Sequence, residues 1–234
     1  MDSPELTEKF IKLASVDNKT IVFYYRHMIV PVIMKYIKKT DHFLDLGCAG
    51  GVLLTLLRER GFENLYGIDA AQALLDRIPD KSISTVCDNY MNVRQRYAEG
   101  QSDAATVFNT LHHLDSKEEY CRFFENLHYI MKPGAVVMVK ELHNGLFYKT
   151  YNAVLHSRLA NKLFPSIFSS RDFVQTEEED MHSRFFREFI PFLDEIVQAG
   201  GKFKILKRYK PLTFENLIVL KRNGNYLQRT IQIQ

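Results

Sequence analysis

The stretch Phe43-Leu44-Asp45-Leu46-Gly47-Cys48-Ala49-Gly50-Gly51 decides the fold of this 234-residue chain. A short apolar run carries the carboxylate of Asp45 and ends in a turn of small residues. The residues that follow, 52–58, place apolar side chains at the spacing of a helix packed on a sheet. The stretch therefore predicts a strand, a tight loop and a helix in succession.

The loop of residues 47–51 has the composition of a ligand-binding turn. Glycine takes positive φ without penalty and has no Cβ, so a ligand can lie against bare backbone. The amides at the start of the following helix favour polar or anionic groups. A plain tight turn has the same composition, so the loop needs support from other parts of the chain.

The spacing of the glycines separates two nucleotide-binding families. A dinucleotide-binding loop reads G-x-G-x-x-G, and Val52 stands where its third glycine would be. The stretch instead resembles the D-x-G-x-G-x-G loop of class I S-adenosylmethionine-dependent methyltransferases, through Asp45, Gly47 and Gly51. Ala49 departs from that pattern at the middle glycine, where a methyl group would narrow the space beside the methionine part of the cofactor.

Composition favours one α/β domain over residues 1–222, followed by a polar tail, 223–234. With 46% hydrophobic residues the chain can build a substantial core. The net charge is only +3, and the Lys and Arg residues are spread along the chain without the long basic block that would indicate a nucleic-acid-binding surface. Three widely spaced cysteines indicate neither a disulfide framework nor a zinc site and fit a reducing cytoplasm. We expect no signal peptide, no membrane span, and a monomer or homodimer.

Strands and helices alternate along the chain with short connections, which is typical of a largely parallel sheet. Helical spacing is seen in residues 4–14 and 18–38, which form an N-terminal cap within residues 1–39, and again in 70–77 and 115–131. The expected strands are 42–46, 64–69, 82–86, 103–108, 135–142, 202–208 and 215–222, the last two forming an antiparallel pair. The turn Met131-Lys132-Pro133-Gly134 should lead into the fifth strand.

The resemblance implies a Rossmann-like three-layer fold with a seven-stranded sheet of order 3-2-1-4-5-7-6, strand 7 antiparallel. It also implies that the helix before the glycine loop closes over the cofactor. Tyr24, Tyr25, Arg26 and His27 form a polar, aromatic cluster in that helix. Tyr24 is therefore a candidate cofactor contact, although the tyrosines could simply pack while the cations stay solvated.

Asp69 ends the second predicted strand, a little over twenty residues beyond the loop. A carboxylate there can accept hydrogen bonds from both ribose hydroxyls of a bound adenosine, or it can cap the following helix. Asp88 matches the family position that receives the adenine amino group, and it too has the alternative role of a cap. The resemblance adds Ala70, Asn89 and Asn109 as further cofactor contacts.

The exit of the fourth strand, Asn109-Thr110-Leu111-His112-His113-Leu114, lies nearest the chemistry. In open α/β sheets ligands sit beyond the carboxyl ends of the strands, and the sequence resembles the L-H-H-L exit of many small-molecule methyltransferases. His112 and His113 are candidate proton acceptors, and Glu141 could orient one of them or take the proton itself. The histidines could equally line the pocket without reacting. Glu141 and His143 do not make a metal site.

The segment 143–182 is long and aromatic, which suggests a lid over the acceptor, or else a helix that thickens the domain or makes a dimer contact. The whole pattern predicts an S-adenosylmethionine-dependent methyltransferase that acts on a small, apolar or aromatic metabolite without a metal. A macromolecular methyltransferase and a non-catalytic cofactor-binding protein are the alternatives. The sequence identifies neither the acceptor nor the atom that is methylated.

Overall fold

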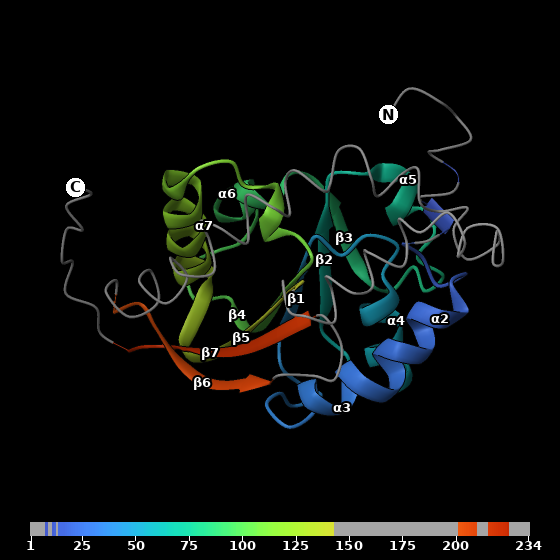
Figure 1. Ribbon diagram of the computed structural model, residues 1–234, viewed down its shortest axis with the longest axis horizontal. Coiled ribbons are helices and arrows are strands. Elements are labelled where there is room, and N and C mark those ends of the chain that lie inside the picture. The colour runs from blue at the N-terminus through green and yellow to red at the C-terminus, as the bar shows by residue number, and fades with distance from the viewer. Residues whose placement is uncertain (1–7, 9–10, 13, 143–200, 210–214, 225–234) are drawn as a thin grey trace, which may run out of the picture.

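A computed structural model describes residue 8, residues 11–12 and 14–142, and residues 201–209 and 215–224. The seven strands of the described part form one mixed sheet in the order β3-β2-β1-β4-β5-β7-β6 (Figure 1). The strands are β1 (Phe43–Leu46), β2 (Leu65–Asp69), β3 (Ser84–Cys87), β4 (Ser102–Phe108), β5 (Met131–Leu142), β6 (Phe203–Tyr209) and β7 (Glu215–Arg222). The predicted order is confirmed, as is the antiparallel β7, which pairs with both β5 and β6.

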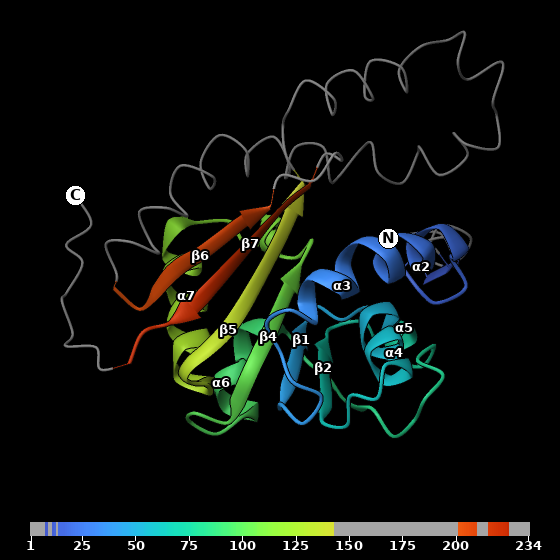
Figure 2. The ribbon, with the colours of Figure 1, turned by 90° about the horizontal axis from the view of Figure 1, so that it is seen from below.

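Helices cover the two faces of this sheet (Figure 2). One face carries α6 (Val93–Arg96) and α7 (Lys117–Ile130), and the other carries the N-terminal helices, α4 (Val52–Glu59) and α5 (Gln72–Leu75). Alternate residues of β5 enter the two cores: Val137 and Val139 face α7, whereas Met138 faces the N-terminal helices and α4. This alternation places Lys140 and Glu141 on opposite faces of the sheet.

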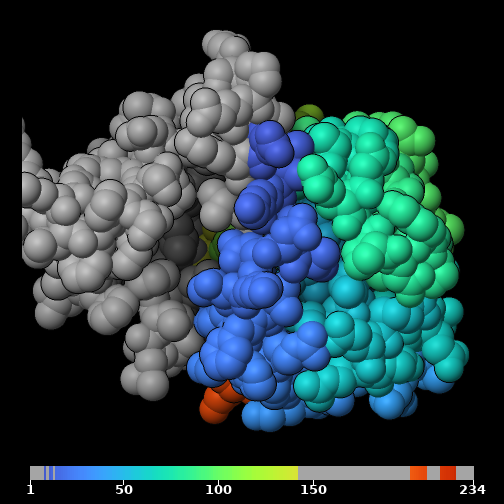
Figure 3. Space-filling model, turned by 90° about the vertical axis from the view of Figure 1, so that its right-hand side faces the viewer, coloured from blue at the N-terminus to red at the C-terminus, as the bar shows by residue number. Residues whose placement is uncertain are grey.

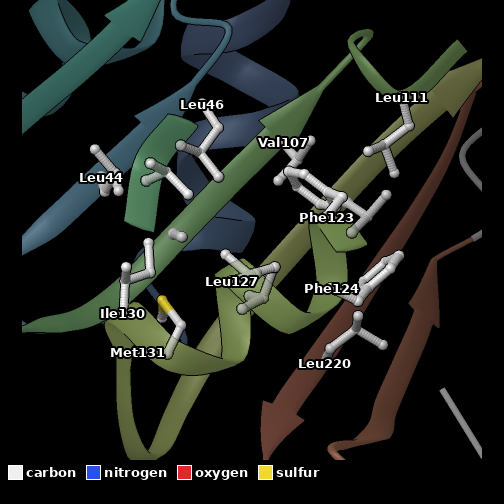
Figure 4. Packing of buried hydrophobic residues seen from close by; sticks show 14 of the residues in the cluster. Leu44, Leu46, Val107, Leu111, Phe123, Phe124, Leu127, Ile130, Met131 and Leu220 are labelled. Atoms are coloured by element: carbon white, nitrogen blue, oxygen red, sulfur yellow. The ribbon is translucent and has the colours of Figure 1, made fainter. Parts of the chain in front are cut away.

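The core beneath α7 is dense and almost wholly apolar (Figure 4). Phe123, Phe124 and Leu127 of α7 are buried against Leu46 and Val107 of the central strands. Ser116 caps α7 by accepting a hydrogen bond from the amide of Glu119. The packing fixes α7 next to the exit of β4, where the candidate catalytic residues lie.

The start of β5 differs from the sequence prediction. The residues expected to form a turn, 131–134, belong to the strand, which starts at Met131 opposite Ser102. The register then shifts so that Val136 pairs with Ala104, and Gly134 has a φ of 82°. A bulge here absorbs the extra residues without ending the strand.

The long N-terminal helix predicted over 18–38 is divided into three parts. Asn18 caps α2 (Lys19–Tyr24), a π-helical turn covers Tyr25–Ile29, and α3 (Val30–Ile33) follows. Within the turn the amide of Val30 donates to the carbonyl of Tyr25, five residues back. Pro31 has no amide hydrogen and would clash with the carbonyl four residues before it, which explains why a regular α-helix does not continue through this point.

The N-terminal segment lies directly against the part of the chain that carries the glycine loop and α4 (Figure 3). Ser15 forms an isolated parallel bridge with Gly50, whose amide donates to the carbonyl of Ala14 at 2.9 Å. Of the predicted helix 4–14 only a few residues are described, and the predicted lid, 143–182, lies outside the described residues. In the described part no helix has both the length and the apolar character needed to cross a bilayer.

Candidate active site

The glycine loop connects β1 to α4 at the carboxyl edge of the sheet. Gly47 and Gly51 have φ values of 76° and 67°, which glycine adopts without strain. A Cβ on Gly47 would lie 2.4 Å from Oγ1 of Thr110, and one on Gly51 would lie 2.6 Å from Cγ1 of Ile78. These two glycines are therefore required by contacts within the protein, whatever lies on the other side of the loop.

The amides of the loop are engaged by the protein itself. Those of Gly47 and Cys48 donate to the carbonyl of Ile68, and that of Gly51 donates to the carbonyl of Cys48. The amide of Ala49 donates to Oδ2 of Asp69 at 2.8 Å. The loop is thus held in shape before any ligand binds, and no side chain caps the first turn of α4 after Gly51 in the described structure.

Asp69 joins the loop to the exit of β2. Besides the bond from Ala49, its Oδ1 accepts the amide of Ala71 at 2.9 Å. The side chain thus forms a tight turn ahead of α5, but it does not cap that helix: α5 begins at Gln72, two residues later than predicted, with Ala71 in the N-cap position and no side-chain cap. Each carboxylate oxygen has a second acceptor position, so these bonds leave capacity for two ribose hydroxyls. Ala70, the neighbouring candidate, is exposed at this edge.

Asp88 and Asn89 follow β3 and lie beside Asp69, because the amide of Asp88 donates to the Asp69 carbonyl at 3.0 Å. The Asp88 carboxylate accepts from Nδ2 of Asn92 and from Nε of Arg96. These donors hold the pKa of Asp88 below its usual value. Asn89 caps the short turn after it by accepting the amide of Met91. Oδ1 also accepts the amide of Asn89. Asp88 is thus anchored locally, and an adenine amino group would need the remaining acceptor position of Oδ2.

Asp45 is buried under the loop and accepts a hydrogen bond from Oγ1 of Thr106 at 2.6 Å. Burial raises the pKa of this carboxyl to about 7, against the opposing effects of Thr106 and Lys140. Thr106 lies opposite Asp45 in the β1–β4 register, so adjacent strands supply both partners. Asp45 is therefore held in the interior of the sheet by its neighbour on β4.

The exit of β4 is organised by Glu141 at the end of β5. Oε1 of Glu141 accepts the amides of Thr110 at 2.8 Å and Leu111 at 2.6 Å. Oε2 lies 3.0 Å from Nδ1 of His112, and both side chains are buried. Glu141 thus fixes the turn 111–113 and orients His112. With Nδ1 donating to the carboxylate, Nε2 of His112 is the acceptor nitrogen of the neutral ring.

His113 differs from His112 in its surroundings. His113 is more accessible to solvent than the buried His112, but its ring packs on that of His112 with centroids 4.2 Å apart. Desolvation by the surrounding protein and the neighbouring His112 lower the pKa of His113 to about 4. His113 is therefore neutral near pH 7 and a weak base.

Asn109 and Tyr24 both lie near Lys140, a residue that the sequence did not lead us to expect in the site. Nζ of Lys140, on β5, lies 3.3 Å from Oδ1 of Asn109 and 5.9 Å from the ring centre of Tyr24. Lys140 is only 1% exposed. The one charged residue in the run Val136-Val137-Met138-Val139-Lys140 was the signal that could have revealed it.

The structure brings the candidate residues to one edge of the sheet. Asp45, Gly47, Ala49, Gly51, Asp69 and Ala70 surround the loop, Asp88 and Asn89 flank Asp69, and Asn109, His112, His113 and Glu141 gather at the exits of β4 and β5. Thr110, also missed, links the two groups by packing against Gly47. No cluster of three or more His, Cys, Asp or Glu side chains suited to a metal ion occurs within the described residues.

Comparison with known proteins agrees with this geometry. Residues 24–180 match the model of a methyltransferase domain family. The chain therefore belongs to this methyltransferase family, and its fold is that of the class I enzymes whose cofactor is S-adenosylmethionine.

Three similar proteins illustrate the relationship. A ubiquinone biosynthesis O-methyltransferase of Rickettsia bellii is 28% identical over an alignment 150 residues long that covers 58% of this chain and 61% of the relative. The PH0226 protein of Pyrococcus horikoshii superposes with a TM-score of 0.64 at 15% identity, covering 91% of this chain and 96% of that one. A SAM-dependent methyltransferase of Methanosarcina mazei gives a TM-score of 0.56 at 17% identity, with coverages of 84% and 99%. The aligned stretch of this chain thus spans about three fifths of the Rickettsia relative.

Proposed function

We propose that this protein transfers the methyl group of S-adenosylmethionine to a hydroxyl oxygen of a small, apolar or aromatic metabolite. The proposal rests on one observation: the glycine loop and the turn after β4 lie side by side. Asp69 holds the loop by accepting the Ala49 amide, Glu141 holds the turn by accepting the Thr110 amide, and Thr110 packs against Gly47. The similarity to an enzyme named as an O-methyltransferase supports oxygen as the acceptor atom.

The half of the site around the glycine loop binds and orients the cofactor. Asp69 receives the ribose hydroxyls, while Asp88 and Asn89 flank the adenine. Gly47, Ala49 and Gly51 give the methionine part a backbone surface. Tyr24 and Asn109 border the cofactor on the acceptor side. Because the sulfonium is already activated, the protein's main task is to align the acceptor oxygen, methyl carbon and sulfur.

When the acceptor hydroxyl binds in its neutral form, a protein group must take up its proton. Nε2 of His112 takes that proton, with Glu141 holding the ring and stabilising the imidazolium. The acceptor oxygen forms a bond to the methyl carbon as the carbon–sulfur bond breaks. The electron pair of the broken bond stays on sulfur, which gives S-adenosylhomocysteine. Atoms and charge balance without an oxidant or a metal.

The test is turnover of isotopically labelled S-adenosylmethionine by the full chain with a panel of phenols, alcohols, amines and an RNA sample. We expect labelled methyl ethers from the phenols, identified by mass spectrometry. Label in RNA or protein would instead support the macromolecular alternative. Binding without turnover of any acceptor would support a non-catalytic role.

We also expect methyl transfer to continue at an unchanged rate after treatment with a chelator, because the proposed chemistry uses no metal. The same assay, run with and without EDTA, measures this. Activity that is lost with EDTA and restored by magnesium would contradict the prediction.

A further inference from the structure

The backbone of Thr110 is held at both its amide and its carbonyl. The amide donates to Oε1 of Glu141, and the carbonyl accepts the amide of His113 and also the hydroxyl of Tyr90, the latter at 3.2 Å. A carbonyl oxygen has two lone pairs, so it can accept both of these donors. Thr110 occupies the N-cap position of the short turn that carries His112. Glu141 and Tyr90 therefore hold the start of this turn from two different parts of the chain.

Tyr90 belongs to the segment that follows β3, on the cofactor side of the site. It begins the 3₁₀ turn Tyr90–Asn92, directly after Asp88 and Asn89. Its half-buried ring packs edge-on against Phe123 of α7, with ring centroids 5.8 Å apart. The ring thus anchors the segment to the core beneath α7, while the hydroxyl at its far end reaches the exit of β4. One side chain therefore connects two parts of the site that come from different strands.

The hydroxyl of Tyr90 remains a hydrogen-bond donor in this environment. Burial raises the pKa of the phenol above its ordinary value, and the carboxylate of Glu141 adds to the effect, followed by those of Glu119 and Asp115. A phenol with a raised pKa is protonated at neutral pH, so its O–H is available to a carbonyl acceptor. The bond from Tyr90 to Thr110 is therefore a constant brace that does not titrate near pH 7.

We propose that Tyr90 is a positioning residue that joins the segment beside the adenine to the turn that carries His112. The inference rests on the proposed function, in which Asp88 and Asn89 flank the adenine and His112 takes the acceptor proton. A cofactor bound against Asp88 and Asn89 restrains their segment, and the Tyr90 hydroxyl extends this restraint to the carbonyl of Thr110. The base is then held most firmly when the cofactor is in place. Since the reaction depends on alignment, a small displacement of the turn lowers the rate.

The first measurement is amide hydrogen exchange in the full chain, followed by NMR with and without saturating S-adenosylhomocysteine. In wild type the ligand should slow exchange of the His113 amide, which shares the Thr110 carbonyl with Tyr90. Tyr90→Phe removes the hydroxyl and keeps the ring against Phe123. Exchange at His113 should then be faster by roughly twofold to tenfold, the range for one net hydrogen bond, and should respond less to the ligand. This measurement does not depend on methyl transfer.

The second measurement is turnover of labelled S-adenosylmethionine with a hydroxyl acceptor. Tyr90→Phe should lower kcat by roughly twofold to tenfold. Affinity for S-adenosylhomocysteine should stay nearly unchanged, because Nδ2 of Asn126 still holds the segment to α7 through the carbonyl of Met91. In a His112→Ala background, whose residual turnover the label makes measurable, Tyr90→Phe should have no further effect, since a residue that acts through His112 has nothing left to position. A general loss of structure would instead lower turnover by the same factor in both backgrounds.

Tyr97→Phe is the matched control. Tyr97 is buried in the same core, but its ring packs edge-on against His42, which precedes β1 at the opposite edge of the sheet, so the substitution should change neither exchange at His113 nor turnover. Unchanged exchange or unchanged kcat in Tyr90→Phe, or an equal loss of turnover in the His112→Ala background, would overturn the positioning role. If wild type methylates no acceptor, the proposed function fails by itself. Faster exchange at His113 in Tyr90→Phe would then still support the link between the two parts of the site, and unchanged exchange would overturn that link as well.

Discussion

At the scale of single residues, backbone strain marks the two halves of the site. Ala49 and Asn109 are the non-glycine residues with positive φ in the described part of the chain, at 47° and 50°. Ala49 lies in the glycine loop, and its amide donates to Asp69. An alanine there costs about 1–2 kcal/mol relative to an unstrained conformation.

Ala49→Gly should therefore raise the free energy of unfolding, by up to about 1 kcal/mol, because relief of strain exceeds the added entropy of the unfolded chain. Urea denaturation measures the change. The same substitution at Ala73, inside α5, should lower stability by about 1 kcal/mol and serves as the control. A loss of stability at position 49 would show that its conformation is unstrained.

Asp69→Ala should weaken binding of S-adenosylhomocysteine at least tenfold, since two hydrogen bonds to a charged acceptor contribute about 1.5–3 kcal/mol each. Calorimetry measures the affinity. Asp76→Ala, which removes an exposed carboxylate from the end of α5, is the matched control. To separate ribose binding from bracing of the loop, the comparison should be repeated with S-adenosylhomocysteine analogues lacking a ribose hydroxyl. Wild type should bind these analogues more weakly than S-adenosylhomocysteine, whereas Asp69→Ala should bind the two with similar affinity.

At the scale of elements, the turn after β4 depends on a carboxylate supplied by the neighbouring strand. Glu141 accepts two amides of that turn and lies within hydrogen-bonding distance of His112, so under the proposed function it acts by positioning the histidine. The sequence allowed Glu141 to orient a histidine or to take the proton. In the structure its oxygens are engaged by the turn and by His112, which favours the orienting role.

His112→Ala should reduce turnover about 10²-fold or more with a neutral hydroxyl acceptor, while S-adenosylhomocysteine affinity stays nearly unchanged. His113→Ala should cost less, because a group with a pKa of about 4 is a weak base. Glu141→Gln should give an intermediate loss, since an amide nitrogen facing Nδ1 favours the wrong tautomer. Steady-state kinetics with saturating acceptor measures all three. If both histidine variants retain wild-type turnover, the acceptor needs no protein base from this turn.

At the scale of the whole molecule, the sheet was predictable and the details of the site were not. Periodicity located the seven strands to within a few residues, and the resemblance carried by Asp45, Gly47 and Gly51 supplied their order. Lys140 was missed because strand periodicity describes burial, and only tertiary contacts show what a buried charge faces. The π-helical turn was missed for a related reason, since Pro31 within a helical pattern signals a break without saying which geometry replaces it.

The free energy of unfolding depends on the protonation state of the Asp45 carboxyl. Its pKa is about 7 in the folded protein and near 3.8 in the unfolded chain, so the folded state binds a proton more tightly. The contribution of Asp45 to stability is thus fully present below about pH 4 and is lost as the pH rises to about 7. His113 and His128, whose pKa values are lowered to about 4, act in the opposite direction, because folding disfavours their protonated forms as the pH falls from 6.5.

The Asp45 contribution can be isolated by comparing wild type with Asp45→Asn, since the histidines and every other group cancel in the difference. The free energy of unfolding of wild type minus that of the variant should fall by up to about 4 kcal/mol between pH 4 and pH 7.5, at about 1.4 kcal/mol for each unit of pKa shift. Urea denaturation at a series of pH values measures this difference. Thr106→Val removes the hydroxyl that favours the ionised carboxylate, so it should raise the pKa of Asp45 further and extend the decline of stability to higher pH. A difference between wild type and Asp45→Asn that is constant over this range would mean that Asp45 is ionised throughout, with its charge balanced inside the fold by Lys140 and Thr106.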